Sequence, residues 1–367
     1  MSESRPPFRV VIIGIGAIAE LIAVALREVP QARLVAGSCR TEAKGRKFAE
    51  QFACAWHGDT ESMLDKERPD VAIVATPSAA HLKAVLACAA RKIHVVCEKP
   101  LEITPARVRQ MIDATSRAGV RLGAIFPQRF NPVNLAIRDA ATAGRFGNLA
   151  VIHAAMPWWR DDAYYAPNRW QGKIALDGGG ALMNQAIHTV DIMQWLAAAT
   201  MPNLRPDENP VAEVFAVTAK RGHDEKLIEV EDTASVILKF RNGAVGQLLA
   251  ATSMYPGVPR RLQISGRDGF AEVFEDQLTT FQFRDERAGD AATREKFGQR
   301  TTHGGGASNP MAMSHENHRR NLADFFDALA ENREPSLNGP EAAKAVEIIA
   351  ACYESARTNG PVRVGAA

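Results

Sequence analysis

The chain has 367 residues, of which 46% are apolar and 23% charged, and its formal net charge is +2. This composition is typical of a soluble globular protein, and at about 150 residues per domain the length predicts two domains. The near-neutral charge excludes an electrostatic argument for nucleic acid or an anionic membrane as a partner. No apolar run approaches the roughly 18 residues that a membrane helix needs.

The cysteines and the N-terminal segment indicate the compartment. The five cysteines are scattered, odd in number and without CxxC spacing. This pattern is typical of a reducing environment and of neither a disulfide scaffold nor a zinc site. The residues before the first predicted strand lack the apolar segment of a signal peptide. We therefore expect a cytoplasmic protein without a bound metal.

Strand and helix signals alternate over the first third of the chain. The predicted strands are residues 8–14, 34–39, 70–76, 93–98 and 120–126. The predicted helices are residues 17–28, 41–52, 62–66, 78–91 and 105–118. Thr104 is a candidate N-cap of the last helix, with Pro105 at its first position and Gly119 as its C-terminal cap. Apolar strands separated by helices indicate an α/β domain with a doubly wound parallel sheet, which we assign to residues 1–128.

A glycine-rich turn, GIGAIA, follows the first predicted strand. Gly14 allows a tight turn, Gly16 lets a pyrophosphate approach the backbone, and Ala19 permits close packing of helix on strand. The phosphates would bind N–H groups at the helix start, including those of Ala17 and Ile18. The alternative is a tight turn without a ligand. The position of the motif inside a βαβ unit favours a Rossmann dinucleotide-binding domain.

The end of the second predicted strand bears on the choice of coenzyme. A ribose-binding acid is expected about 20 residues after the glycines, and Cys39 stands at that place. Without a carboxylate, nothing there repels a 2′-phosphate, which Arg40 could pair with and Ser38 could bind through its hydroxyl. We therefore expect a preference for NADP(H). NAD(H) is the alternative if Arg40 and Lys44 are ordinary solvated charges.

The segment HVVCEKP places two charged side chains directly after an apolar strand. Pro100 disfavours helical backbone at Lys99, so the chain leaves the strand in an extended conformation. Glu98 and Lys99 are then held at the end of the strand. In a parallel sheet this edge is where ligands bind.

The pattern changes after Pro132. The predicted strands are residues 149–156, 211–219, 233–240, 244–251, 261–265, 270–274 and 279–283. The turns at 241–243 and 266–269 join consecutive strands as hairpins. We therefore predict an α+β domain over residues 129–367 with an open, mainly antiparallel sheet. Its predicted helices are 180–198, 316–332 and 341–357, the last a candidate to pack back on the first domain, and residues 285–309 are expected to form a loop.

The helix predicted at 180–198 carries a polar stripe behind a run of three glycines, DGGGALMNQAIHTVD. The glycines at 178–180 let the backbone approach another group closely. Asn184, His188 and Asp191 lie at i, i+4 and i+7, on one face of a regular helix whose other faces are apolar. Buried polar groups need partners. The stripe therefore predicts a ligand site or, alternatively, a core histidine that bonds Asp191.

Two further groups of residues are candidates for a site. The segment PWWRDDAYYAPNRW contains Arg160, Tyr165 and Trp170, which suit a polyhydroxylated ligand that stacks on aromatic rings. The equal alternative is that these residues cover the sheet or form an interface. His315 and His318 have i, i+3 spacing, but without HExxH or a third ligand they predict a surface pair and no metal site.

These motifs resemble those of the Gfo/Idh/MocA oxidoreductases. The resemblance rests on VVIIGIGAIA, VAIVATPSAAHLKAVLACAARKIHVVCEKPL, FPQRFNP, GGGALMNQAIHTVD and EAAKAVEIIAACYESAR, in this order along nearly the whole chain. It implies a Rossmann domain followed by a sheet that often forms the subunit interface of dimers or tetramers. It also implies hydride transfer between NAD(P) and a carbinol or carbonyl carbon of a sugar, sugar derivative or polyol.

The resemblance implies roles for individual residues. Lys99 matches the lysine that approaches the nicotinamide and the reacting hydroxyl, where an ammonium group stabilises alkoxide charge. His188 matches the acid/base histidine of the family. Asn184 stands where many members carry an aspartate, so it could hold a substrate hydroxyl but could not take a proton. The positions implied to line or support the cofactor site are Thr76, Pro77, His81, Glu98, Gln128 and Arg129.

The resemblance also bears on the substrate and on other functions of the fold. Asn184 and Gln185 look like the subgroup that includes nucleotide-sugar 3-dehydrogenases, and Gln185 is expected to contact the substrate. A nucleotide-sensing protein without catalysis and a redox-neutral glycosidase or epimerase with tightly bound NAD are the alternatives. The presence of both Lys99 and His188 favours the dehydrogenase. We expect a sugar-like substrate, a homodimer or homotetramer, and neither nucleic acid nor membrane as partner.

Overall fold

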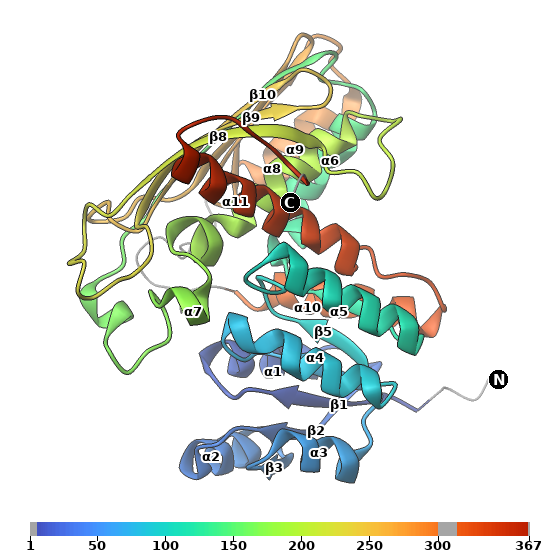
Figure 1. Ribbon diagram of the computed structural model, residues 1–367. Helices are drawn as coiled ribbons and strands as arrows, with labels where there is room; N and C mark the ends of the chain where they lie inside the picture. Colours follow the sequence, from blue (N-terminus) through green and yellow to red (C-terminus); the bar gives the residue numbers. More distant parts are fainter. Residues whose placement is uncertain (1–5, 300–313, 366–367) are drawn as a thin grey trace, which may run out of the picture. The chain divides into compact units, whose positions relative to one another are not determined.

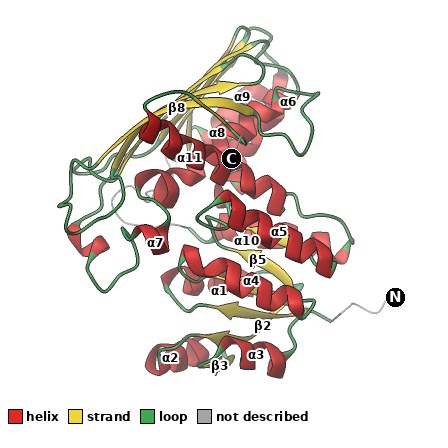
Figure 2. Cartoon of the chain, viewed as in Figure 1, coloured by secondary structure: helices red, strands yellow, loops and turns green. Residues whose placement is uncertain are grey.

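The computed structural model describes residues 6–299 and 314–365. It contains two compact units (Figure 1). The first comprises the described residues of Met1–Pro127 and His315–Ala343, and the second those of Gln128–Ser314 and Lys344–Ala367. Figure 2 distinguishes their helices from their strands. Within the described ranges, none of the helices combines the length and the apolar character of a membrane span.

The first unit contains a six-stranded sheet of order β3-β2-β1-β4-β5-β6 with all neighbours parallel. Its strands are β1 (Phe8–Ile13), β2 (Ala32–Ser38), β3 (Ala55–His57), β4 (Val71–Val74), β5 (His94–Cys97) and β6 (Leu122–Ala124). The doubly wound fold predicted from the sequence is thereby confirmed. The strand order reverses between β1 and β4, the switch point beyond whose carboxyl ends such sheets bind ligands.

Helices alternate with these strands: α1 (Ala17–Arg27), α2 (Glu42–Phe52), α3 (Thr60–Glu67), α4 (His81–Ala90) and α5 (Pro105–Ala118). The predicted caps of α5 are present, because Thr104 accepts a hydrogen bond from the N–H of Arg107 and Gly119 has a φ of 68°. A left-handed φ of this kind suits glycine, which has no Cβ. The ends of α5 are therefore determined locally.

Helix α10 (Glu316–Ala330) belongs to the first unit, whereas the sequence placed its residues in the second domain. Phe325 and Phe326 are buried in the same apolar cluster as Phe8, and the rings of Phe8 and Phe326 are 5.8 Å apart. Asn321 accepts a hydrogen bond from the N–H of Phe126 at 2.9 Å. An apolar helix face shows that a helix packs on a core, but not on which core.

The second unit contains an eight-stranded sheet of order β13-β12-β11-β7-β10-β9-β8-β14. Its strands are β7 (Leu149–Pro157), β8 (Val211–Ala219), β9 (Thr233–Phe240), β10 (Val245–Ala251), β11 (Arg261–Gly266), β12 (Gly269–Phe274), β13 (Gln277–Phe283) and β14 (Val362–Arg363). Only β7 and β10 pair in parallel, and both predicted hairpins are present. The prediction of a mainly antiparallel sheet is confirmed.

The two faces of this sheet differ in exposure. Alternate residues such as Val236, Leu238 and Leu248 are buried, and α8 (Ile187–Ala199) packs against β7 with α6 (Pro132–Thr142) against α8. Apolar side chains that alternate with them along the strands are 39–54% exposed. This alternation is the period-two pattern of a sheet with one covered face. These exposed side chains are Val151, Phe215, Val217, Ile237 and Val245.

Three helices of the second unit complete the comparison with the sequence. Helix α6 was not predicted from the sequence, although Asn131 caps it and Pro132 occupies its first position. The expected loop at 285–309 is wrong in part, because α9 (Ala288–Phe297) lies inside it, and residues 300–309 fall outside the described part of the chain. Helix α11 (Gly339–Thr358) corresponds to the predicted helix 341–357. Its residues up to Ala343 cluster with the first unit and the rest with the second.

Candidate active site

The glycine turn after β1 has the shape that a dinucleotide requires. Gly14 has a φ of +92°, and a Cβ on it would lie 2.8 Å from the carbonyl oxygen of Ala75. Gly16 is the N-cap of α1, and no described atom lies within 4 Å of the place of its missing Cβ. The start of α1, with Ala17 and Ile18, presents unpaired N–H groups and the positive end of the helix dipole. This open, positively polarised turn fits a pyrophosphate.

Two buried polar atoms at neighbouring strand ends also fit a ligand. Oγ1 of Thr76, after β4, and Oε1 of Glu98, after β5, have no hydrogen-bond partner among the residues that the structure describes. The other carboxylate oxygen of Glu98 accepts a hydrogen bond from the N–H of Lys99 at 3.0 Å. Burial raises the pKa of Glu98 to about 7, and the ammonium of Lys99 opposes this rise. Hydroxyl or amide groups of a bound dinucleotide would satisfy both atoms.

His81 connects the segments that follow β4 and β5. Its Nε2 lies 2.9 Å from the carbonyl oxygen of Thr76, and its Nδ1 lies 2.9 Å from that of Pro100. The ring is buried, and loss of solvation lowers its pKa. His81 therefore supports the segment that carries Lys99, whose own side chain is half-buried. Pro77, before the short turn Ser78–Ala80, is also half-buried.

The residues expected to select the coenzyme differ in exposure. Ser38 is 2% exposed, and its hydroxyl lies 3.0 Å from Oγ1 of Thr60. Cys39 is half-buried, and its thiol donates to the carbonyl oxygen of Thr41. Arg40 is exposed. Arg40 is therefore an accessible cation directly after β2, and Lys44 is exposed as well, whereas the hydroxyl of Ser38 bonds within the protein.

Gln128 and Arg129, expected near the cofactor, bond to residues of the second unit. Arg129 donates to the carboxylate of Asp191 from Nε at 2.7 Å and from Nη2 at 2.6 Å. The side-chain oxygen of Gln128 accepts a hydrogen bond from Arg260 at 2.9 Å. These contacts place Asp191 of the predicted polar stripe in an ion pair with Arg129.

The predicted histidine helix begins with a π-helical turn, η4 (Ala181–Ala186), and continues as α8. Asn184 lies in the π turn and His188 in the first turn of α8, where it is half-buried. A π turn contains more residues than a regular α turn. The prediction of regular α spacing therefore does not hold at Asn184, whereas His188 and Asp191 both lie in α8.

Side chains from three segments form a network at the π turn. Asn184 donates through Nδ2 to Asp177 at 2.6 Å and accepts through Oδ1 from Gln185 at 2.7 Å. Nε2 of Gln185 also donates to the hydroxyl of Tyr164 at 2.9 Å, and its Oε1 accepts from Arg160 at 2.9 Å. Burial lowers the pKa of Arg160 and raises that of Tyr164 to about 12. The network presents amide, phenol and guanidinium groups that can orient a polyhydroxylated ligand.

Asp177 was not predicted to belong to this network, and Tyr164 was not singled out within the aromatic segment that was predicted to suit a polyhydroxylated ligand. Asp177 directly precedes the glycine run, and Tyr164 lies in the aromatic segment next to Tyr165. Tyr165 was expected to bind substrate, but it is 3% exposed and its hydroxyl donates to Thr252 at 2.9 Å. Trp170 is half-buried, and its place in a substrate site stays a prediction. The hydroxyl of Tyr164 accepts a hydrogen bond from Gln185, whereas that of Tyr165 donates to Thr252, and the sequence does not reveal this difference in partners.

The two histidines at the start of α10 are not a surface pair. Nε2 of His315 lies 2.9 Å from a carboxylate oxygen of Glu28, whereas His318 is only 5% exposed. The prediction that both lie on the surface is therefore wrong for His318, which belongs to the buried face of α10. In the described part of the chain, no group of three or more His, Cys, Asp or Glu side chains could hold a metal ion.

The fold and the glycine turn after β1 fit a dinucleotide-binding protein, and two family models give its class as an oxidoreductase. Residues 8–126 match the model described as oxidoreductase family, NAD-binding Rossmann fold. Residues 138–364 match the model of the C-terminal alpha/beta domain of the same family. The chain belongs to the Gfo/Idh/MocA oxidoreductase family.

Individual relatives span most of the chain. The myo-inositol 2-dehydrogenase of Thermotoga maritima is 29% identical over 291 residues, which are 78% of this chain and 80% of that protein. The D-glucoside 3-dehydrogenase of Escherichia coli is 26% identical over 252 residues, 65% of this chain and 68% of that protein. The crystal structure of the WlbA dehydrogenase from Bordetella pertussis in complex with NADH and UDP-GlcNAcA has a TM-score of 0.87 and 26% identity, with full coverage of both chains.

Proposed function

We propose that the protein is an NAD(P)-dependent dehydrogenase or reductase acting on a carbinol or carbonyl carbon of a sugar, sugar derivative or polyol. The observation that carries the proposal is the position of Glu98 and Lys99. They follow β5 at the carboxyl edge of a sheet whose first strand ends in the Gly14 turn. When bound there, the nicotinamide supplies or accepts the hydride.

Three residues have roles in this proposal. Lys99 stabilises the negative charge that develops on the substrate oxygen, since an ammonium group is effective where alkoxide charge appears. His188 exchanges the hydroxyl proton as general acid or base. Asn184, whose amide is oriented by Asp177 and Gln185, holds a substrate hydroxyl and takes no proton.

The preferred coenzyme in this proposal is NADP(H). Cys39 stands in place of a ribose-binding acid, and the exposed Arg40 next to it can pair with a 2′-phosphate. The buried hydroxyl of Ser38 already bonds Thr60, so Arg40 carries this recognition. The WlbA structure contains NADH, so NAD(H) is the alternative coenzyme. An experiment must distinguish it from NADP(H).

The proposed substrate is polyhydroxylated and bound through the network at the π turn. The relatives are a myo-inositol dehydrogenase and a glucoside dehydrogenase, and the WlbA complex contains UDP-GlcNAcA. Gln185, Arg160 and Tyr164 offer donors and acceptors that suit several hydroxyl groups. Inositols, glucosides and nucleotide sugars are therefore the classes to test first.

The proposed assembly is a homodimer or homotetramer formed through the exposed face of the large sheet. Apolar side chains such as Phe215, Val217 and Ile237 are exposed on adjacent strands, and contiguous exposed apolar surface is typical of interfaces. Light scattering should give a mass of two or four chains, and Phe215→Lys with Val217→Lys should reduce it.

The proposed compartment is the cytoplasm. The five cysteines are free thiols, which supports the proposal of a reducing environment.

The proposed function is tested first by coenzyme binding. Protein stripped of coenzyme is titrated with NADPH and with NADH by nucleotide fluorescence. Arg40→Ala should weaken NADPH binding and spare NADH, whereas Arg33→Ala, an exposed arginine in β2, should change neither. Preference for NADH would overturn the coenzyme proposal alone, and binding of neither would overturn the oxidoreductase proposal.

Turnover is tested next, with the preferred coenzyme and a panel of inositols, glucosides and nucleotide sugars. Lys99→Ala should bind coenzyme but lose turnover, since its ammonium acts on the developing alkoxide. His188→Ala should lose turnover likewise. Near-normal turnover in Lys99→Ala would contradict the proposed mechanism.

A further inference from the structure

The π turn that carries Asn184 and Gln185 is held from outside its own helix. The first N–H groups of any helix have no partner within the helix and must be satisfied otherwise. At residues 180–183, four consecutive N–H groups donate to two residues that are distant in the sequence, Glu231 and Tyr353. Glu231 lies between β8 and β9, and Tyr353 lies in α11.

Glu231 accepts three of these four hydrogen bonds. Its Oε2 accepts from the N–H of Gly180 at 2.9 Å, and its Oε1 from that of Leu182 at 2.8 Å. Its backbone oxygen accepts from the N–H of Ala181 at 2.9 Å. A carboxylate at a helix N-terminus is favourable because it faces N–H groups and the positive end of the helix dipole.

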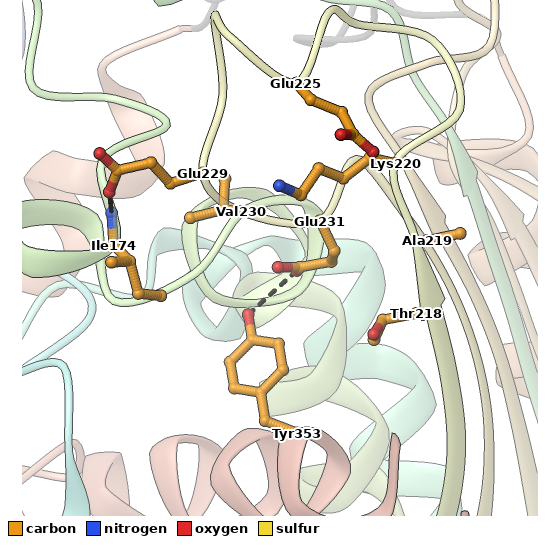
Figure 3. Close-up of a pocket in the computed structure, with 9 residues that line it drawn as sticks. All are labelled: Ile174, Thr218, Ala219, Lys220, Glu225, Glu229, Val230, Glu231 and Tyr353. Carbon is orange, nitrogen blue, oxygen red and sulfur yellow. Dashed lines mark hydrogen bonds between the residues drawn. The ribbon is translucent and has the colours of Figure 1, made fainter. Parts of the chain in front are cut away.

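Tyr353 completes the cap and fixes the carboxylate. Its hydroxyl accepts a hydrogen bond from the N–H of Met183 at 3.3 Å. The same hydroxyl donates to Oε1 of Glu231 at 3.0 Å, as Figure 3 shows. Burial and the neighbouring Glu231 raise the pKa of Tyr353 well above its ordinary value, so the phenol remains a donor. Glu231 and Tyr353 therefore act as one hydrogen-bonded unit.

The glycine run makes room for this unit. A Cβ on Gly179 would lie 1.9 Å from the hydroxyl oxygen of Tyr353, and a Cβ on Gly180 would lie 1.8 Å from the backbone oxygen of Glu231. Real Cβ contacts this short do not occur, so any side chain at these positions would displace the cap. The close approach predicted from the glycines is thus an approach to Glu231 and Tyr353.

The cap also borders a cavity of about 430 Å³. Figure 3 shows Lys220 and the exposed Glu225 among the side chains that line it, together with Glu231 and Tyr353. Burial raises the pKa of Glu231, and its backbone donors oppose the rise. Glu225 offers a matched comparison, because it is a carboxylate at the same cavity without a role in the cap.

We propose that Glu231 and Tyr353 are positioning residues that hold the π turn so that Asn184, Gln185 and His188 meet the substrate in productive geometry. Single π turns inside helices occur frequently at functional sites. Here the capped N–H groups belong to Gly180 and to the first three residues of the turn, and His188 follows two residues after the turn ends. A displacement of about 1 Å at reacting groups can reduce turnover about 100-fold, so a fixed helix start matters for catalysis. This inference rests on the proposed function of the same site.

The test compares Glu231→Gln, Tyr353→Phe and the double variant with Glu225→Gln as control. Glutamine keeps the shape of glutamate but replaces an acceptor oxygen with a donor, and phenylalanine removes the hydroxyl alone. We expect kcat, expressed per coenzyme-binding site, to fall about 10- to 100-fold in both single variants. Coenzyme affinity should stay the same, and Glu225→Gln should behave as wild type. The double variant should lose little more than the worse single one, because the two residues act as a unit.

A purely structural role has a different signature. It would lower the unfolding temperature and the fraction of coenzyme-binding protein while kcat per site, KM and the pH profile stayed unchanged, and that outcome would overturn the inference. Hydrogen exchange of the peptide 178–188 should accelerate in Glu231→Gln and Tyr353→Phe, and unchanged exchange would also overturn it. If wild type turns over no compound of the panel, the proposed function fails, while the exchange data still test the cap.

Discussion

Arg129 holds Asp191 in a two-pronged ion pair, with Nε 2.7 Å from Oδ2 and Nη2 2.6 Å from Oδ1. The side chains are only 4% and 0% exposed. The pair connects the start of the second unit to α8, the helix that carries His188. Removing one partner of a buried pair leaves the other charge in a poorly solvated interior, whereas removing both avoids that penalty.

We expect Arg129→Met and Asp191→Leu each to lower the free energy of unfolding by about 3–5 kcal/mol. The double variant should lose less than the sum of the two, because no single charge is left behind. Urea denaturation followed by circular dichroism measures this. Losses that add up in the double variant would contradict a direct ion pair between Arg129 and Asp191.

Coenzyme titration of both single variants tests the prediction from the sequence that Arg129 lines the cofactor site. If it does, only Arg129→Met should weaken coenzyme binding.

The pKa of Glu98 predicts a stability that falls as pH rises. Its carboxyl group titrates at about 7 in the fold, against an ordinary value of 4.5, because burial disfavours the charged form. Between these values the folded state binds more protons than the unfolded state, so stability decreases with pH. The full effect, reached above pH 7, is about 3 kcal/mol. Glu98→Gln should remove this contribution from the pH dependence of stability, and a profile between pH 4.5 and 7.5 that Glu98→Gln does not alter in urea titrations would refute the assignment.

His318 predicts the opposite slope. Burial lowers its pKa to about 4 from 6.5, with a smaller effect of His315. As pH falls from 6.5 to 4, the unfolded chain binds a proton that the fold does not, so stability decreases on acidification by about 3 kcal/mol.

Glu98 and His318 change the free energy of unfolding over overlapping pH ranges and in opposite directions. We therefore expect the stability of wild type to depend only weakly on pH. His318→Leu should reveal the descending slope of Glu98. Its cost at pH 7 should be small, because Nδ1 has no hydrogen-bond partner among the described residues. His315→Gln should change the profile only slightly, because His315 is the smaller of the two causes that lower the pKa of His318. A wild-type profile that His318→Leu does not alter would contradict this explanation.

Local signals explain why much of the fold was predictable. The caps of α5, the hairpin turns and the glycine turn depend on residues that are neighbours in sequence. Strand β3 has only three residues, and nothing in its composition distinguishes it from a loop. The unit to which α10 belongs depends on contacts of Phe325 and Phe326 with a distant core, which periodicity does not encode.

The candidate site was predictable in its residue types but not in its connections. Asn184, Gln185 and Arg160 were identified from motifs, and the structure joins them through Gln185. The π turn was not predictable, because the polar residues Asn184, His188 and Asp191 have the spacing of a regular α-helix. Glu231 is 51 residues from Gly180 in the sequence, and Tyr353 is 170 residues from Met183. Only the fold brings these residues together.

The glycine run allows a direct test of that long-range cap. Gly180→Ala would place a methyl group 1.8 Å from the backbone oxygen of Glu231, which is not a flexible side-chain end. We expect a loss of about 1–3 kcal/mol in unfolding free energy, typical of overpacking, and a larger loss of turnover than of coenzyme binding. Gly289→Ala is the control, because Gly289 lies in α9 with no described atom within 4 Å of its Cβ position. Alanine there should stabilise by about 0.5–1 kcal/mol. Equal effects of the two substitutions in urea denaturation would show that Gly180 does not approach Glu231 in solution.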